Sequence, residues 1–362
     1  MSIGKQREAM TQVFNEVRAP SKMLQRFFTT KKNGRSQTSR VSIDVRREEE
    51  HVAVAIRPGS PVDIAGPELH DADDYTSKSF EPPSYNPGTV IPVQDLLDRY
   101  PGQSPFEAPE FRVDLRARMF DTMGELHKSV VRAIEVQASQ VLQTGVLSLV
   151  DRAGNVAYTI DYKPKATHFP TVGTSWTNPA ANAAGDLEDV CEVVKDDSGI
   201  VISTAVMGRE AFRNFRKNTD IQAQLNYRRG DFVAFKPELR EGGGTLQGRV
   251  NIGDYAIDIW TYNATYLKED TSVRTKYVDV NNVILLSEDT RLDKLTAAPA
   301  RPLGEDPLLA PFNPGRLQGD EFDAEPFLWT PDNRRSLHGE LGTRTLLVPV
   351  QIDGFACLDT IL

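Results

Sequence analysis

The sequence has few cysteines and no long apolar stretch. Cys191 and Cys357 are its only cysteines, too few for the disulfide framework of a small secreted domain, so a reducing compartment fits. No stretch approaches the roughly 20 apolar residues of a membrane-spanning helix, and residues 1–28 lack the apolar run of a secretory signal. We therefore expect a protein that remains in the cytoplasm where it is made and has no membrane partner.

Sequence motifs for catalysis and for metal binding are also missing. No two histidines have the i, i+4 spacing that lets one helix face hold a metal; they are His51, His70, His127, His168 and His338. Neither the Gly-x-Ser-x-Gly nucleophile motif nor the Gly-x4-Gly-Lys-Ser/Thr phosphate loop occurs. We predict no catalytic, cofactor-binding or metal-binding residues, and no cofactor.

Three other patterns have a functional and a structural interpretation. The glycine run at 242–248 lacks the lysine that would reach a phosphate, so we interpret it as a flexible hairpin connection. The aromatic and basic segment 212–229 could stack on nucleic acid, but its spacing fits an amphipathic helix that buries Phe212 and Phe215. Acidic side chains that are adjacent in sequence do not face one another across a cleft and are interpreted as solvated; they lie at 48–50, 73–74 and 196–197.

Size and composition are those of a folded protein. The chain has 362 residues, of which 39% are hydrophobic and 26% charged, so it is too apolar for wholesale disorder and long enough for two domains. Its net charge of −9 argues against a coat for duplex DNA. Residues 1–47 hold eleven basic and three acidic residues, a net +8 that leaves −17 on the remainder. This basic segment could pair with the acidic body of another copy or with nucleic acid, and a solvated tail is the alternative.

The N-terminal third predicts an arm, a hairpin and a long loop. Apolar residues have helical spacing at 10–17, and the polar segment 31–39 is typical of a loop. Alternation at 41–45 and again at 52–56 predicts a hairpin. Nine prolines at 58–105 indicate an extended, projecting loop.

The longest predicted element is a helix over 109–144. The Ser-Pro-Phe-Glu sequence at 104–107 has the form of a capping box with proline at the first helical position, and Gly145 is typical of a helix end. Apolar residues recur on one face: Phe111, Leu115, Met119, Thr122, Leu126, Val130 and Ala133. At 1.5 Å per residue such a helix is about 50 Å long, which indicates a structural spine.

The remainder of the chain predicts a mixed α+β architecture. A hairpin at 146–162 with its turn at 151–155 is followed by a loop at 167–184 that contains Trp176. Further elements are helices at 186–195 and 209–218, strand-rich stretches at 200–205, 248–266 and 280–286, a proline-rich connection at 291–334, and closing strands at 345–350 and 355–362.

Taken in order, these elements resemble the lambda-type major capsid protein family of tailed bacteriophages, the major capsid protein E family. The stretches that carry the resemblance are 41–45 with 52–58, 158–162, 208–215, 257–262, and Trp329 with 346–349. The resemblance implies the α+β capsid fold of the Hong Kong phage type. This fold has an N-terminal arm, an extended β-hairpin loop, a long spine helix, a peripheral domain and an axial domain.

On this resemblance the chain divides into five parts. They are an N-terminal arm at 1–40; a β-hairpin and extended loop at 41–105; a peripheral domain at 106–184 with the spine helix at 109–144; an axial domain with a proline-rich return connection at 185–335; and C-terminal strands at 336–362 that return to the peripheral domain.

The implied function is that of a major head protein rather than an enzyme. Copies would self-assemble into hexamers and pentamers of an icosahedral shell around packaged double-stranded DNA, which they would contact only non-specifically. The arm is too short for a fused scaffolding domain, so a separate scaffolding protein is implied, together with a portal protein, and a decoration protein is left open. The protein would reside in the virion after assembly in the host cytoplasm.

Two other functions remain as alternatives at this stage. The same fold builds encapsulin-type compartments in bacteria, and a metal-independent hydrolase would need scattered acids to converge in a pocket. Some relatives cross-link Lys to Asn between subunits. Lys78 lies in the corresponding region, but nothing marks a partner, so we predict no cross-link.

Overall fold

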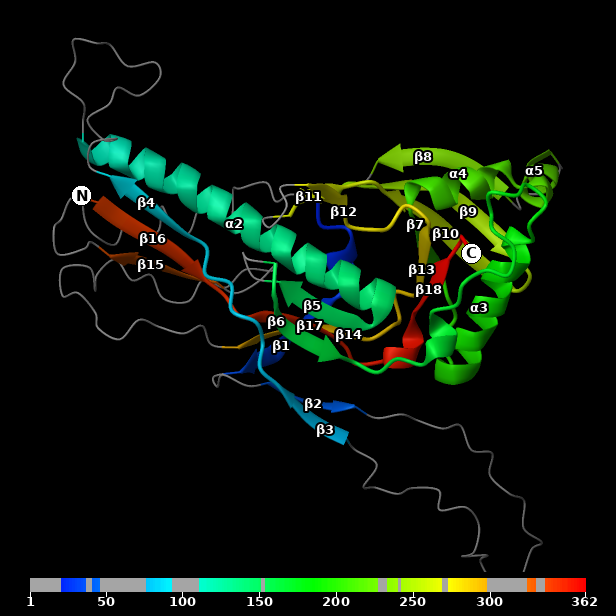
Figure 1. Ribbon diagram of the computed structural model, residues 1–362, viewed down its shortest axis with the longest axis horizontal. Helices are drawn as coiled ribbons and strands as arrows, with labels where there is room; N and C mark the ends of the chain where they lie inside the picture. Colours follow the sequence, from blue (N-terminus) through cyan, green and yellow to red (C-terminus); the bar gives the residue numbers. More distant parts are fainter. Residues whose placement is uncertain are drawn as a thin grey trace, which may run out of the picture.

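The computed structural model describes most of the chain (Figure 1). The described residues are 21–36, 41–45, 76–92, 111–150, 154–226, 233–239, 242–268, 273–297, 324–329 and 336–362. The predicted arm helix at 10–17, the predicted strand at 52–56 and the capping box at 104–107 lie outside these residues.

The predicted spine helix is present as α2, Phe111–Thr144, which has 34 residues. It ends at Gly145, whose positive φ of 66° suits glycine and whose N–H donates to the carbonyl of Val141 at 2.9 Å. A Cβ at position 145 would overlap the ring of Pro164. The glycine therefore both stops the helix and lets the chain turn tightly into the next hairpin.

The buried face of α2 is rotated from the predicted one. Val130 is buried as predicted, but Thr122, Leu126 and Ala133 are only partly buried. The face that enters the core combines apolar and polar residues: Met123, His127, Val130, Val131, Ile134, Glu135, Ala138, Val141 and Leu142. The helical spacing of apolar residues did not predict this face, because it takes no account of buried polar side chains. Such side chains are tolerated in a core when they form hydrogen bonds.

A six-stranded sheet forms the end of the molecule away from the free end of α2 (Figure 1). Its order is β18 (Ala356–Asp359), β13 (Asn282–Leu286), β7 (Thr204–Met207), β10 (Tyr255–Tyr262), β9 (Gly244–Ile252) and β8 (Val233–Leu239). The β7–β10 pair is parallel and the other pairs are antiparallel. Three helices follow in the same region: α3 (Ala183–Ser198), α4 (Arg209–Lys217) and α5 (Thr219–Asn226).

Alternation along the strands divides the interior into two cores, one on each face of this sheet. Ile259 of β10 and Leu285 of β13 point toward the helices α3 to α5, where they meet residues such as Leu187 and Phe215. We call this the helix-covered core. Trp260 and Ile284 point the other way and join a cluster with α2, which we call the spine core.

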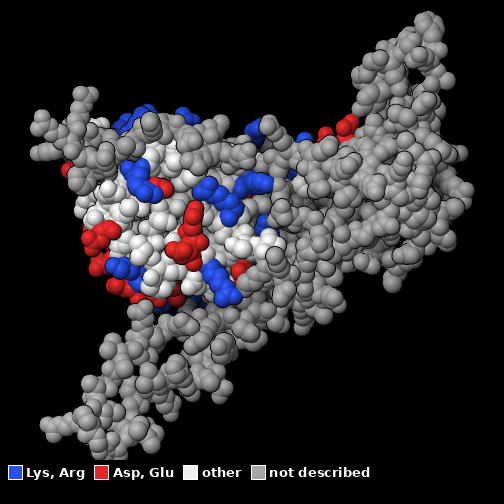
Figure 2. Space-filling view, turned by 180° about the vertical axis from the view of Figure 1, so that it is seen from behind, with Lys and Arg blue, Asp and Glu red and all other residues white. Residues whose placement is uncertain are grey.

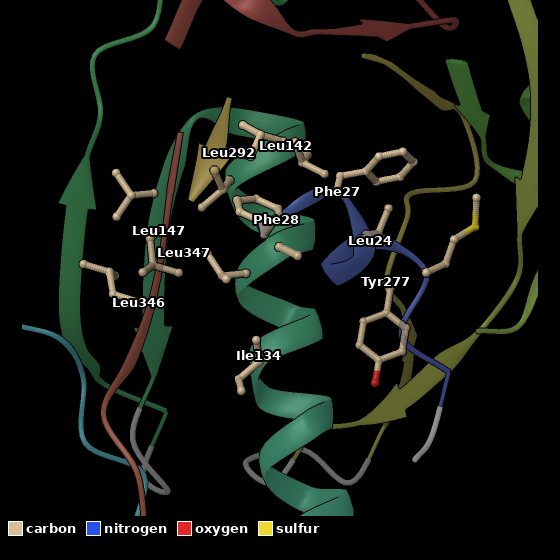
Figure 3. Packing of buried hydrophobic residues seen from close by; sticks show 14 of the residues in the cluster. Leu24, Phe27, Phe28, Ile134, Leu142, Leu147, Tyr277, Leu292, Leu346 and Leu347 are labelled. Carbon is tan, nitrogen blue, oxygen red and sulfur yellow. The ribbon is translucent and has the colours of Figure 1, made fainter. Parts of the chain in front are cut away.

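The spine core collects segments that are far apart in the sequence. It contains side chains from η1 (Leu24–Phe27), α2, and the hairpin β5 (Val146–Val150) and β6 (Val156–Asp161). It also contains side chains from β14 (Leu292–Ala297) and β17 (Thr345–Pro349), two strands of a sheet whose third strand is β1 (Thr29–Ser36). Figure 3 shows Leu24 and Phe27 on one side of α2, with Leu346 and Leu347 on the other.

Smaller sheets complete the structure. β15 (Glu325–Trp329), β16 (Ser336–Gly342) and β4 (Gly88–Pro92) lie along the first half of α2 (Figure 1). β2 (Val41–Val45) pairs with β3 (Thr76–Phe80), and β11 (Thr265–Leu267) pairs with β12 (Arg274–Lys276). Short 3-10 turns occur at η3 (Ala166–His168) and η5 (Ile352–Gly354).

Two sequence-based expectations about strands need correction, and a third strand has a partner that was not predicted. The predicted loop at 31–39 is largely the strand β1, which pairs in parallel with β14. The strand at 41–45 pairs with 76–80, and its predicted partner at 52–56 lies outside the described residues. The connection at 291–334 contains β14 and β15. In each case the strand is defined by a partner that is remote in the sequence, which local composition cannot reveal.

The closing strands also differ from the expectation that 336–362 returns as a whole to the peripheral domain. β16 and β17 do join sheets beside α2, whereas β18 pairs with β13 at the edge of the six-stranded sheet. The predicted hairpin at 146–162 and the helices predicted at 186–195 and 209–218 are confirmed. The strand predicted at 200–205 lies slightly later, at β7.

Candidate functional site: a polar hub on the long helix

Polar side chains of α2 connect this helix to remote parts of the chain. Glu135, Gln137, Ser139 and Gln143 each form hydrogen bonds with segments more than fifty residues away; we call these four residues the polar hub. Glu135 and Gln137 are fully buried, with 0% exposure. Spacing of four residues places Glu135, Ser139 and Gln143 on one side of the helix and leaves Gln137 on the opposite side.

Glu135 fixes the N-terminal segment. Its Oε1 accepts the backbone N–H of Leu24 at 2.9 Å, and its Oε2 accepts that of Gln25 at 3.2 Å. The Gln25 Nε2 donates a hydrogen bond to the carbonyl of Val131 at 2.7 Å. Because Leu24 and Phe27 are buried against the helix at the same place, residues 21–28 are held by both packing and directional bonds.

The surroundings of Glu135 are apolar and phenolic. Burial raises the pKa of its carboxyl to about 7, against the opposing effect of the Leu24 N–H, the nearby Tyr262 hydroxyl and the Gln25 N–H. Burial also raises the pKa of Tyr262 and of Tyr277 well above the usual value. Both phenols therefore remain neutral across the physiological pH range.

Gln137 reaches in the opposite direction, to β17 and to the segment that leads into β4. Its Nε2 donates to the Tyr85 hydroxyl at 2.6 Å and to the carbonyl of Thr345 at 3.1 Å, while its Oε1 accepts the N–H of Leu347 at 3.3 Å. Tyr85 and Thr343 exchange two backbone bonds of 2.9 Å. One amide side chain therefore holds two remote segments in register.

Ser139 and Gln143 connect α2 to the six-stranded sheet. The Ser139 hydroxyl and the Gln143 Nε2 both donate to the carbonyl of Tyr277. The Gln143 Oε1 accepts the N–H of Asp279 at 2.9 Å and the side-chain amide of Asn282 at 3.2 Å. Since Asn282 begins β13, the hub sets the position of the sheet relative to the helix.

The glycine run beyond β8 receives the start of the N-terminal segment. Lys22 N–H donates to the carbonyl of Gly242 at 3.0 Å. A Cβ at Gly243, where φ is +84°, would overlap the Ser21 side chain, and one at Gly244 would overlap that of Met23. β8 and β9 pair as a hairpin, but the run from Gly244 onward belongs to β9 and not to a flexible connection. The close approach of residues 21–23 explains the glycines at 242–244.

A cation–π contact completes the docking of this segment. The guanidinium of Arg26 lies 4.2 Å from the ring centroid of Trp260 and 4.7 Å from that of Phe27. The contact places one basic residue of the N-terminal segment on the six-stranded sheet.

A second junction holds the chain that follows β3. Arg344 donates to the Glu81 carboxylate at 3.0 Å and to the carbonyl of Pro82 at 3.1 and 3.3 Å. The hydroxyl of Tyr158, on β6, donates to the carbonyl of Glu81. Arg344 has only 9% exposure, whereas the Glu81 side chain is 57% exposed, so only the arginine of this junction is withdrawn from solvent.

The three described histidines lie on separate elements. His51 and His70 lie outside the described residues, and His127, His168 and His338 lie on α2, η3 and β16. Within the described ranges, no group of three or more His, Cys, Asp and Glu side chains could hold a metal ion. Cys191 and Cys357 are buried free thiols, each with a pKa raised by burial.

In the acidic pair at 196–197, which was predicted to be solvated, Asp197 is instead partly buried and paired. Asp197 accepts from Lys165 at 2.6 Å and contacts His168 Nε2 at 2.8 Å, while His168 Nδ1 lies 3.0 Å from the carbonyl of Phe355. The hydrogen bond from Lys165 is the main reason that the pKa of Asp197 is lowered. Asp196 is exposed, as predicted, and the acids at 48–50 and 73–74 lie outside the described residues.

The remaining sequence candidates have structural positions. Phe215 is fully buried and lies 5.8 Å from Trp176 between ring centroids, so the core interpretation is confirmed for it, and Phe212 is partly buried. Lys78 lies in β3 opposite Ile43. Sequence reasoning missed Glu135, Gln137 and Arg344, whose partners lie far away in the sequence.

Comparisons with known proteins identify the family. A family model described as phage major capsid protein E matches residues 6–307. A prophage protein of E. coli CFT073 described as a capsid protein has a TM-score of 0.62 at 12% identity, covering 98% of each chain. The capsid of Ralstonia phage GP4 has a TM-score of 0.49 at 12% identity, covering 96% of this chain and 92% of that one. The holo-SrpI encapsulin of Synechococcus elongatus PCC 7942 has a TM-score of 0.47 at 11% identity, covering 96% and 89%. No curated protein matches significantly.

The likeness to the prophage protein defines the class, an α+β protein with the capsid fold of tailed phages, as the sequence predicted. We infer the fold from that protein alone, because the other two TM-scores are below 0.5. The family model matches well over half of the sequence, and the chain belongs to the phage major capsid protein E family. It is a structural protein that assembles with copies of itself into the capsid of a virion.

The described part of the surface carries charges of both signs. Basic and acidic side chains both occur across the described part of the face shown in Figure 2, without one continuous patch of a single sign. Among the helices of the described residues, none is both long enough and apolar enough to cross a membrane.

Proposed function

We propose that this chain forms the hexamers and pentamers of an icosahedral shell that encloses packaged double-stranded DNA. The observation that carries the proposal is the polar hub. It holds the N-terminal segment, the approach to β4 and the six-stranded sheet on one long helix. A subunit in a closed shell needs such rigidity, because small angular errors accumulate around a ring of identical contacts.

The two junctions would define where the arm and the extended loop leave the subunit. The docked residues 21–28 precede β1, and the Arg344 junction fixes residues 81–82 after β3. We infer that chain extending from these points lies across neighbouring subunits. The net +8 of residues 1–47 would then meet the acidic remainder of an adjacent copy, which favours correct encounter and register.

The proposal includes further partners. A separate scaffolding protein would direct curvature, a portal protein would occupy one vertex, and a decoration protein could bind outside. The excess of acidic residues over basic ones, 51 against 42, supports DNA contacts that are non-specific and weak. Assembly would occur in the host cytoplasm, and the chain would act without catalysis.

Electron microscopy of the recombinant protein, with and without its candidate scaffold, tests this function. Gln137→Ala should yield irregular or open particles, because β17 and the approach to β4 lose a common bond partner. Gln222→Ala, which changes an exposed glutamine of α5, is the matched control and should give regular shells. Folded protein that remains monomeric under every condition would overturn the proposal. Regular shells that carry a cargo enzyme in place of DNA would indicate an encapsulin-type compartment.

A further inference from the structure

Glu135 is a buried acid whose described neighbours are mainly neutral hydrogen-bond donors. Two backbone N–H groups of residues 24 and 25 bind its two oxygens, and the Tyr262 hydroxyl lies beside it. A buried carboxylate without an ionic partner is costly when charged. Its ionisation is therefore opposed by the same packing that docks the N-terminal segment.

The titratable and charged groups around Glu135 come from each packed element. Tyr262 lies on β10 and stacks on Tyr277, which precedes β13, with a centroid distance of 5.9 Å. Arg132 of α2 acts on Tyr277, and Arg26 of η1 lies over Trp260. The phenols stay neutral near pH 7, so the acid is the group of this cluster that titrates there.

Undocking of residues 21–28 would admit water to the carboxyl. The pKa of Glu135 is about 7 when docked, against a usual value of 4.5. Between these two pH values, Glu135 is therefore protonated in the docked state and ionised in the undocked state. Docking is strengthened as pH falls through this window and weakened as pH rises.

We propose that Glu135 is a positioning residue that couples docking of residues 21–28 to the protonation of its own carboxyl group, so that the segment is released as pH rises. The neutral acid keeps one oxygen to accept an N–H and can donate its own proton to a neighbouring phenol. The charged Glu135 carboxylate must either remain buried away from water or displace residues 21–28 to reach it. Release would free everything that precedes β1 to contact other surfaces.

Hydrogen exchange of the unassembled full-length chain tests this coupling. After correction for intrinsic exchange, the opening constant of residues 22–28 should rise on the order of 50-fold between about pH 5 and about pH 8. Glu135→Gln, which removes the titration but keeps the shape, should give a flat profile. Glu125→Gln changes an exposed acid of the same helix and should retain the wild-type response. Peptides from β13 serve as the internal reference.

The fluorescence of Trp260 provides a second measurement on the unmodified protein, because Arg26 covers its ring only when the segment is docked. A transition near pH 7 that disappears in Trp260→Phe supports the proposal. Protection that does not change with pH in the wild type, or an unchanged pH response in Glu135→Gln, would overturn it. None of these readouts requires shells to form, so the outcome is separate from the test of capsid assembly.

Discussion

The two cores of this subunit are built by different means. The helix-covered core takes its apolar side chains mainly from 172–285. The spine core joins segments as distant as residues 23 and 357, and polar side chains of α2 hold these segments in place. Apolar burial is strong but non-directional, whereas hydrogen bonds specify register. The first core therefore provides stability, and the second provides the geometry of a shell subunit.

The largest expected effect concerns the helix-covered core. Phe215→Ala should lower the free energy of unfolding by about 3–5 kcal/mol, because a fully buried ring is replaced by a cavity. Denaturant titration followed by circular dichroism measures this loss. Phe212→Ala, at a partly buried position of the same helix, is the control. Equal losses at the two positions would contradict the burial difference.

Loss of a hub side chain should be smaller and local. Gln137→Ala leaves the N–H of Leu347 and the carbonyl of Thr345 without this partner, which should cost about 1–3 kcal/mol. Hydrogen exchange should increase in β17 and near Tyr85, with β7 and β13 unchanged. A uniform increase across both cores would show that they do not differ as described.

The glycine run offers a sharper test of how the N-terminal segment docks. Gly243→Ala adds a Cβ at a φ of +84° that overlaps Ser21, and the strain should cost about 1–2 kcal/mol. Limited proteolysis should then cut residues 21–28 faster than in the wild type. In the control Gly173→Ala, the added Cβ meets no atom within 4 Å, and residues 21–28 of this variant should be cleaved at the wild-type rate. Similar rates for all three proteins would contradict the close approach.

The smallest effect is expected at an exposed ion pair. Arg249 and Asp258 are bridged at 2.6 Å across β9 and β10, with side-chain exposures of 63% and 32%. Solvent screening should keep the effect of Arg249→Ala on unfolding below about 1 kcal/mol. Thermal melts at low and high salt check this, and the difference between the proteins should shrink as salt is added. A loss comparable to that of Phe215→Ala would contradict this ranking.

Elements with local signals could be predicted from the sequence. The long helix has sustained periodicity and a glycine stop, and the hairpin after it has an alternating pattern with a turn. For α3, an Asn182 cap at 3.1 Å and Gly199 in the left-handed conformation mark both ends. These features depend on residues that are close in the chain, so composition and spacing carry the information.

Elements that depend on distant partners could not be predicted. All six residues of β14 are buried, including Asp293 and Lys294, so its pattern differs from that of an ordinary apolar strand. β1 is polar and becomes a strand only because β14 is available beside it. The hub was missed for the same reason, since Glu135 and Gln137 are typical of a solvated helix surface until their partners are known.

The kind of group that the polar hub binds also affects which substitutions the sequence can tolerate during evolution. Glu135 and, for most of their bonds, Gln137 and Gln143 bind main-chain N–H and carbonyl groups, which every residue type except proline offers in full. Substitutions at the contacted positions can therefore accumulate without breaking the connections, provided that the side chains still fit. Extensive neutral divergence can occur while the architecture persists, in keeping with 12% identity to the prophage protein at a TM-score of 0.62.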